Sequence, residues 1–265
     1  MGHGADTRIE GEEMTLELNK IYCMDCLEGL KLIDNESVDL VVADFPYNIS
    51  QCSNAITKVG ADFQKADFGE WDKFAFEDYC KWIIDVSFEI NRILKPKHQA
   101  YCWFDNSYTG HYNKLIEDAT ELKIKCPIVC YKRNPIPQIF KKNFRSSFDM
   151  CTLFVKDKDK KCEPFNFLTQ QEMKNVQEYN LCKMTEHPTE KNLELVKRFV
   201  SISSNEGDTV LDPFMGSGTT AVACKQLRRN FIGFELSQKY VDIANKRLSQ
   251  ETIFDYVLEG ALCQQ

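Results

Sequence analysis

The chain has 265 residues, of which 43% are hydrophobic and 28% charged, and its formal net charge is −7. This length is enough to bury the core of one large α/β domain, and this composition excludes a wholly disordered chain. The acidic balance also excludes a histone-like protein that binds nucleic acid by bulk charge.

The N-terminal half alternates short apolar segments with turns. Residues 1–13 lack the apolar core of a signal peptide and no later run is long enough for a membrane helix, so we expect a disordered leader and a cytoplasmic protein. The pattern then predicts a strand over Leu16–Tyr22, a helix over Asp25–Ile33 and a buried strand over Val38–Asp44. The polar stretch Asn48–Lys73 is expected to be a lid or a disordered loop.

The middle of the chain begins with the clearest helix. Apolar residues at spacings of three and four predict a helix over Phe76–Leu94, which Lys95 and Pro96 end. Further strands are predicted in the following segments: Tyr101–Phe104, Ile128–Tyr131 and Met150–Val155.

The C-terminal part follows a polar segment, Lys156–Glu186, that has little apolar pattern. Helices are predicted over Asn192–Ser201, Thr219–Leu227 and Tyr240–Leu248, and strands over Thr209–Leu211 and Phe231–Phe234. The alternation predicts an α/β fold, a doubly wound and mostly parallel sheet with one inserted segment, as a single domain over residues 14–265.

The twelve cysteines are expected to be free thiols, because a reducing cytosol disfavours disulfides. Cys23 and Cys26 have zinc-ligand spacing, but no histidine lies near them and Cys126 and Cys130 are one residue too far apart for a matching pair. We therefore predict no metal site.

A glycine-rich turn follows the predicted strand Thr209–Leu211 and opens the next helix. Gly216 and Gly218 let the backbone approach a ligand, and Glu235 ends the following strand 19 residues after Gly216. This carboxylate is placed to accept hydrogen bonds from the ribose hydroxyls of an adenosine-bearing cofactor. The alternative is a turn that serves only helix–strand packing.

The same turn also fits the dinucleotide fingerprint, because Gly216, Gly218 and Ala221 have the spacing G-x-G-x-x-A. An NAD-dependent enzyme is therefore a competing interpretation. Only 30 residues follow Glu235, too few for the second half of such a fold. The absence of a following Gly-Lys-Ser/Thr excludes a phosphate-binding P-loop.

A second motif, Asp44-Phe45-Pro46-Tyr47, follows the buried strand at the edge where open α/β sheets bind ligands. A carboxylate and a backbone carbonyl that each accept one N–H can draw an exocyclic amine of a base toward tetrahedral geometry. Its lone pair can then attack a sulfonium methyl, while an aromatic ring stacks on the extruded base. Asp44, the Pro46 carbonyl and Tyr47 supply these three parts, although the motif alone could also be a strand-ending turn.

Together the two motifs resemble the DNA amino-methyltransferases, whose catalytic signature is D-P-P-Y and whose cofactor motif is F-x-G-x-G. The catalytic motif comes first, as in the beta group of adenine-N6 and cytosine-N4 enzymes, and the resemblance covers about Leu16 to Leu248. Further matches are Arg92–Pro96, Tyr131–Pro135 and His187–Lys191, the last of which reads H-P-T-E-K.

The resemblance implies a Rossmann-like fold, S-adenosyl-L-methionine as cofactor and double-stranded DNA as partner, and it also suggests a homodimer. Its catalytic residues correspond to Asp44, Phe45, Pro46 and Tyr47. Its cofactor-binding residues correspond to Asp25, Thr189, Lys191, Asp212, Pro213, Phe214, Gly216, Gly218, Thr219 and Glu235. It divides the domain into a catalytic half (14–110), a DNA-facing and target-recognition region (111–186), a cofactor-binding half (187–248) and a tail (249–265).

A basic strip lies in the expected DNA-facing region. The segment between Cys130 and Asp149 contains five basic residues and no acidic residue. We expect its side chains to contact phosphates, with a solvated protein face as the alternative. Its members are Lys132, Arg133, Lys141, Lys142 and Arg145.

Three residues depart from the family pattern. Phe45 replaces the first proline of the catalytic motif and is expected to loosen the backbone there, Tyr131 replaces a tryptophan, and Asn192 replaces the proline that usually follows Lys191. None of these changes removes a catalytic atom.

The sequence therefore favours methylation of adenine N6 in a specific DNA sequence. Asp44 favours adenine, because family members that act on cytosine N4 more often have serine there. The alternatives are cytosine-N4 methylation, a catalytically silent module that binds cofactor or DNA, and methylation of RNA or protein by the same chemistry.

Overall fold

The computed structural model describes residues 16–48, 56–59, 62–65, 75–137, 141–181 and 191–250. Its strands are β1 Lys20–Cys23, β2 Val38–Asp44, β3 Ile56–Val59, β4 Asp62–Lys65, β5 Leu94–Trp103, β6 Leu122–Lys132, β7 Phe148–Lys156, β8 Val176–Tyr179, β9 Thr209–Asp212 and β10 Asn230–Glu235. Its helices are α1 Cys26–Lys31, α2 Phe76–Ile93, α3 Thr109–Ala119, α4 Leu193–Ser203, α5 Thr219–Gln226 and α6 Gln238–Leu248. Within this described part, no helix is both long and apolar enough to cross a bilayer.

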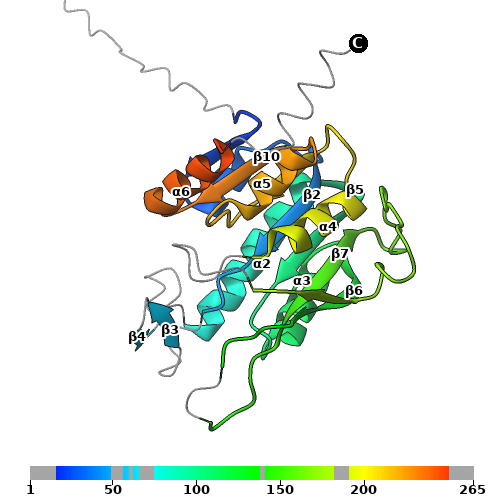
Figure 1. The fold of residues 1–265 in the computed structure, drawn as a ribbon. Helices are drawn as coiled ribbons and strands as arrows, with labels where there is room; N and C mark the ends of the chain where they lie inside the picture. Colours follow the sequence, from blue (N-terminus) through cyan, green and yellow to red (C-terminus); the bar gives the residue numbers. More distant parts are fainter. Residues whose placement is uncertain are drawn as a thin grey trace, which may run out of the picture.

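Eight strands form one sheet in the order β1-β10-β9-β2-β5-β7-β6-β8 (Figure 1). Every neighbouring pair is parallel except the two that involve β7, which runs antiparallel to both β5 and β6. The predicted doubly wound, mostly parallel sheet is confirmed.

Helices cover both faces of this sheet (Figure 1). Successive residues of β2 point to opposite faces, so Val41 packs in one apolar cluster and Val42 in the other. Helices α1, α2 and α3 supply the first cluster, whereas α4, α5 and α6 supply the second. The molecule therefore has three layers, with a separate core on each side of the sheet.

The order in which the chain adds strands to the sheet reverses between β2 and β9. These two strands lie side by side, with Val41 opposite Leu211. From β9 the chain continues through α5 to β10 on one side, and from β2 it continues through α2 to β5 on the other. Open α/β sheets bind their ligands at such a switch point, outside the carboxyl ends of the strands. Asp44 ends β2 and Asp212 ends β9, so both motifs lie at this point.

Some elements differ from the sequence prediction. The first strand begins at Lys20 and not at Leu16, and the predicted loop Asn48–Lys73 contains the antiparallel pair β3-β4. Helix α3 and strand β8 were not predicted. The leader (1–13), loop residues 49–55, 60–61 and 66–73, and tail residues 251–265 lie outside the described residues.

Candidate active site

Asp44, Tyr47 and Lys191 form a connected polar cluster at the end of β2. The Lys191 ammonium lies 2.8 Å from Asp44 Oδ2 and donates a hydrogen bond to Tyr47 Oη at 3.0 Å. Tyr47 Oη in turn donates to Asp44 Oδ1 at 3.2 Å. Both carboxylate oxygens of Asp44 therefore have a donor beside them.

The electrostatics of this cluster follow from its burial. Burial raises the pKa of Asp44 above its ordinary value, and the Lys191 ammonium opposes that rise. Burial would lower the pKa of Lys191, but Asp44 and Tyr47 beside it hold that pKa well above its ordinary value. The ammonium therefore favours the ionised form of Asp44.

The Pro46 carbonyl, the second acceptor of the motif, receives a hydrogen bond from the Tyr79 hydroxyl. Tyr79 is fully buried on α2, and its ring stacks on that of Trp82 with 5.7 Å between centroids. A carbonyl oxygen has two lone pairs, so this contact orients the carbonyl and leaves one acceptor position. Tyr79 was not predicted as a site residue, because the apolar pattern of α2 gave its aromatic residues only a packing role.

Phe45 is buried and joins the catalytic motif to the cofactor turn. Its ring centroid lies 4.7 Å from that of Phe104 and 4.9 Å from that of Phe214, which follows β9. Its N–H donates to the Trp103 carbonyl at 3.2 Å. A proline at this position has no N–H to donate, so Phe45 adds a backbone hydrogen bond. The expectation that Phe45 loosens the motif is therefore wrong.

Asp212 shapes the glycine-rich turn from inside. Its Oδ1 accepts the Phe214 N–H at 2.9 Å and its Oδ2 accepts the Thr220 hydroxyl at 2.6 Å. Only 5% of its surface is exposed, and this burial raises the pKa of Asp212 to about 7. The structure thus gives Asp212 two contacts within the protein, which fix the turn against α5.

Glu235 faces the same turn from the end of β10. Its carboxylate accepts the Gly216 N–H at 3.0 Å and the Ser237 N–H at 2.8 Å, and burial raises the pKa of Glu235. Gly216 has φ 52°, a left-handed conformation that favours glycine. Each carboxylate oxygen has two lone pairs, so Glu235 retains acceptor capacity for a pair of ribose hydroxyls.

Asp25 lies at the end of the neighbouring strand. Strand β1 pairs with β10, with Cys23 opposite Glu235, and the Met24 N–H donates to the Glu235 carbonyl at 3.1 Å. Asp25 caps α1 by accepting the Leu27 N–H at 2.9 Å. Asp25 and Glu235 therefore lie at the same edge of the sheet, where β1 and β10 end. This arrangement is consistent with a nucleoside bound by both acids.

Gly218 has a packing role. It has φ 84°, and a Cβ built on it would lie 2.7 Å from the Cβ of Ala244 on α6. Its N–H donates to the Met215 carbonyl at 2.9 Å, and the neighbouring Thr219 Oγ1 lies 3.4 Å from a guanidinium nitrogen of Arg247. The packing interpretation therefore accounts for Gly218, while Gly216 faces Glu235.

The basic strip is divided by its partners. Lys132 forms a part-buried ion pair of 2.6 Å with Asp149, and Arg133 pairs with Glu178 at 2.8 Å. The Arg145 guanidinium donates to the Pro135 carbonyl.

Two lysines of the strip present their charge outward. Lys141 and Lys142 are exposed, and no described residue forms an ion pair with either. Phe144 beside them is 94% exposed. This loop between β6 and β7 therefore combines two outward lysines with an exposed aromatic ring.

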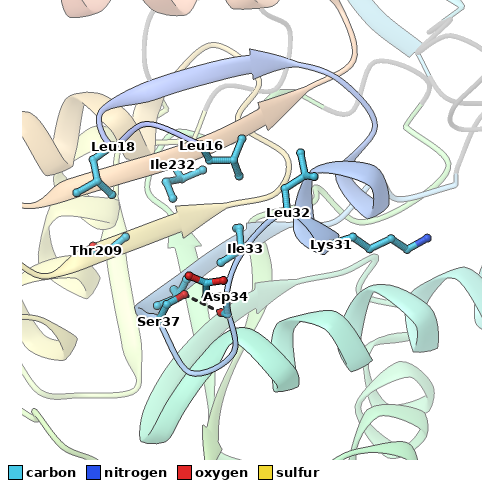
Figure 2. Close-up of a pocket in the computed structure, with 10 residues that line it drawn as sticks. Leu16, Leu18, Lys31, Leu32, Ile33, Asp34, Ser37, Thr209 and Ile232 are labelled. Carbon is cyan, nitrogen blue, oxygen red and sulfur yellow. Dashed lines mark hydrogen bonds between the residues drawn. The ribbon is translucent and has the colours of Figure 1, made fainter. Parts of the chain in front are cut away.

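Two other features lie away from these motifs. A hollow of about 540 Å³ lies at the amino ends of β2 and β9, where Val38 and Thr209 line it together with Leu18, Leu32 and Ile33. Figure 2 shows Lys31 at its margin, extended away from the other lining residues.

In the described ranges no three histidine, cysteine or acidic residues are grouped to hold a metal. Thr189 lies outside the described residues.

Known DNA methyltransferases are similar to this chain over most of its length. Residues 38–246 match the family model described as DNA methylase. Over 255 residues the chain is 33% identical to the type II methyltransferase M.HinfI of Haemophilus influenzae, covering 88% of this chain and 69% of the relative. Over 245 residues it is 34% identical to the type II methyltransferase M2.DpnII of Streptococcus pneumoniae, covering 86% and 88%.

Two solved structures extend the comparison. The M1.HpyAVI complex with S-adenosylmethionine is 27% identical, with a TM-score of 0.62 over 86% of this chain and 98% of that one. The cytosine-N4-specific PvuII DNA methyltransferase is 17% identical and shares the fold, with a TM-score of 0.71 over 92% of each chain. The family match spans most of the chain and places both motifs inside it, so this protein belongs to the DNA methylase family of N6 and N4 amino-methyltransferases.

Proposed function

We propose that this protein transfers the methyl group of S-adenosylmethionine to the N6 amine of a flipped adenine in a specific DNA sequence. The observation that carries the proposal is the adjacency of β2 and β9, whose carboxyl ends bear Asp44 and the Glu235-linked turn. A methyl donor bound at that turn would therefore be close to an amine bound by Asp44.

The cofactor side of the reaction uses acids at two strand ends. Glu235, which faces the glycine-rich turn, would accept hydrogen bonds from the ribose hydroxyls, and Asp25 at the end of the neighbouring strand would lie toward the adenine. When bound, S-adenosylmethionine supplies an electrophilic methyl group on a sulfonium.

The substrate side uses the D-F-P-Y motif. The Asp44 carboxylate and the Pro46 carbonyl each accept one N–H of the target amine, which frees the nitrogen lone pair to attack the methyl carbon. Tyr47 stacks on the extruded base, and Tyr79 orients the Pro46 carbonyl. As the N–C bond forms, the bond between the methyl carbon and the sulfonium would break, and the sulfur would keep the bonding pair as a neutral thioether. The methylated amine would then lose one proton to water.

Adenine is favoured over cytosine by the acid at position 44, in keeping with the family resemblance. Cytosine-N4 methylation would use the same acceptors and is the second candidate.

Glu235→Ala is expected to weaken S-adenosylmethionine binding by about 1.5–3 kcal/mol, because the variant cannot form charge-assisted hydrogen bonds to the ribose. Calorimetry on the purified variant measures this directly. The matched control is Glu206→Ala, which removes an exposed glutamate that pairs with Arg228. Unchanged affinity in a folded Glu235→Ala protein would refute the assignment of Glu235 to the cofactor.

Neutralising Lys141 and Lys142 together is expected to reduce the salt dependence of DNA binding, by about 0.9 in log–log slope for each phosphate that the protein no longer neutralises. The sequence preference should persist, because phosphate contacts position the protein and base contacts specify. Fluorescence anisotropy over a salt series measures the slope. The control, Lys239→Ala with Lys246→Ala, removes the same charge from exposed positions on α6. If both double variants show the same salt-dependence slope, the loop is a solvated face that does not contact phosphates.

The substrate class is tested by transfer of a radiolabelled methyl group to DNA, RNA and protein in parallel reactions. Incorporation into DNA alone is expected. Incorporation only into RNA or protein would redirect the proposal, and cofactor and DNA binding without transfer would indicate a silent module.

A further inference from the structure

Lys191 is held in place by the start of α4. Asn192 caps this helix, because its Oδ1 accepts the Leu195 N–H at 3.0 Å, and its Nδ2 donates to the Asn180 carbonyl at 3.0 Å. The residue that departs from the family proline thus ties the chain beside Lys191 both to α4 and to the segment after β8.

The Lys191 side chain is largely enclosed at the catalytic motif. Only 15% of it is exposed, and its ammonium contacts Asp44 Oδ2 at 2.8 Å and Tyr47 Oη at 3.0 Å. The same ammonium lies 5.3 Å from the centroid of the Tyr47 ring and 5.7 Å from that of Trp103. The Asp44 carboxylate and the face of the Trp103 ring both stabilise a cation at these distances, so the geometry favours a charged lysine.

The other charged groups around Asp44 are mainly acidic. Asp149 on β7 and Asp212 at the end of β9 both interact electrostatically with Asp44, and Asp149 disfavours its charge. Lys132, the cation nearest Asp149, is paired with it at 2.6 Å, and Tyr179 on β8 donates to Asp149 at 3.0 Å. Within the described part of the chain, Lys191 is therefore the cation that contacts Asp44.

We propose that Lys191 is a positioning residue that keeps Asp44 ionised and oriented to accept the N–H of the target amine. This inference rests on the proposed function. It differs from the cofactor-binding role that the family resemblance implies for this lysine.

The sign of the effect follows from the contacts. Burial raises the pKa of Asp44 and Lys191 opposes that rise, so removing the ammonium should raise the pKa of Asp44 further. A protonated carboxyl accepts the amine N–H less well. As the pH is lowered, a variant without the ammonium should therefore lose activity at a higher pH than the wild type does.

The test compares Lys191→Met and Lys191→Arg with the wild type, using kcat/KM for methyl transfer as a function of pH. Lys191→Met should move the acidic limb upward by about 1 unit or more, the usual effect of an adjacent opposite charge, and Lys191→Arg should largely restore it. Lys197→Met is the control, because Lys197 lies on α4 and pairs with Glu194 instead. An unmoved acidic limb in folded Lys191→Met would overturn the proposal.

Two further measurements separate the alternatives. Calorimetry should find S-adenosylmethionine affinity nearly unchanged in Lys191→Met, and weaker binding with an unmoved acidic limb would assign this lysine to the cofactor. Carbon-13 NMR of labelled aspartates in the free protein, with Asp44→Asn for assignment, should detect a higher Asp44 titration midpoint in Lys191→Met. This readout decides the proposal even if the wild type transfers no methyl group, whereas an unchanged midpoint would refute it.

Discussion

Asp44→Ala is expected to abolish methyl transfer while the protein still binds S-adenosylmethionine. In the proposed mechanism the carboxylate accepts an N–H of the target amine, whereas the hydrogen bond between Gly216 and Glu235 at the cofactor turn does not involve Asp44. Asp44→Asn is the sharper variant, because it keeps the shape and one acceptor oxygen but removes the charge. It should cost at least about 3 kcal/mol of transition-state stabilisation, as when a preorganised electrostatic group is removed. Single-turnover rates on DNA measure this cost.

The control for Asp44 is Asp242→Asn, which removes an exposed carboxylate on α6 that accepts a hydrogen bond from Gln238. It should methylate DNA at the wild-type rate. A folded Asp44→Ala protein with wild-type activity would contradict the mechanism, whichever base is methylated.

Phe45→Ala is expected to lower the free energy of unfolding by about 3–5 kcal/mol, the usual cost of truncating a buried phenylalanine. The side chain is 1% exposed and packs on Phe104 and Phe214, so its removal leaves a cavity between β2 and the cofactor turn. Denaturant unfolding measures the effect. Phe88→Ala is the control, because Phe88 is 50% exposed on α2 and should cost much less.

Phe45→Pro would restore the family signature, but it should also destabilise this protein. It removes the same aromatic packing and the N–H that bonds to the Trp103 carbonyl. Stability equal to that of the wild type in Phe45→Pro, or equal destabilisation in Phe45→Ala and Phe88→Ala, would show that the aromatic packing contributes little.

The predictable parts of the fold were those with a strong local pattern. The buried run of β2 and the periodicity of α2 predicted their elements nearly to the residue. Helix α3 was missed because its buried Tyr112 and Ile116 stand among polar residues. Strand β8 was missed because its inward residues, Gln177 and Tyr179, are polar or amphipathic, and only its pairing with β6 forms the strand.

The candidate site divides in a similar way. Asp44 and Glu235 could be located from sequence because each follows a recognisable strand, and their catalytic and cofactor roles stay predictions. The contact of Lys191 with Asp44 joins distant parts of the chain, and no local pattern encodes it. The pairing of Lys132 with Asp149 is also tertiary, so composition alone overstated the outward charge of the basic strip.

Methylation of adenine N6 can be tested by mass analysis of nucleosides from DNA methylated in vitro. The DNA should come from a source without adenine or cytosine methylation, and the S-adenosylmethionine should carry a deuterated methyl group. We expect deuterated N6-methyladenine with the wild type and none with Asp44→Ala. Deuterated N4-methylcytosine would overturn the choice of base. If DNA incubated with folded protein that binds the cofactor yields no labelled nucleoside, the proposed reaction is contradicted.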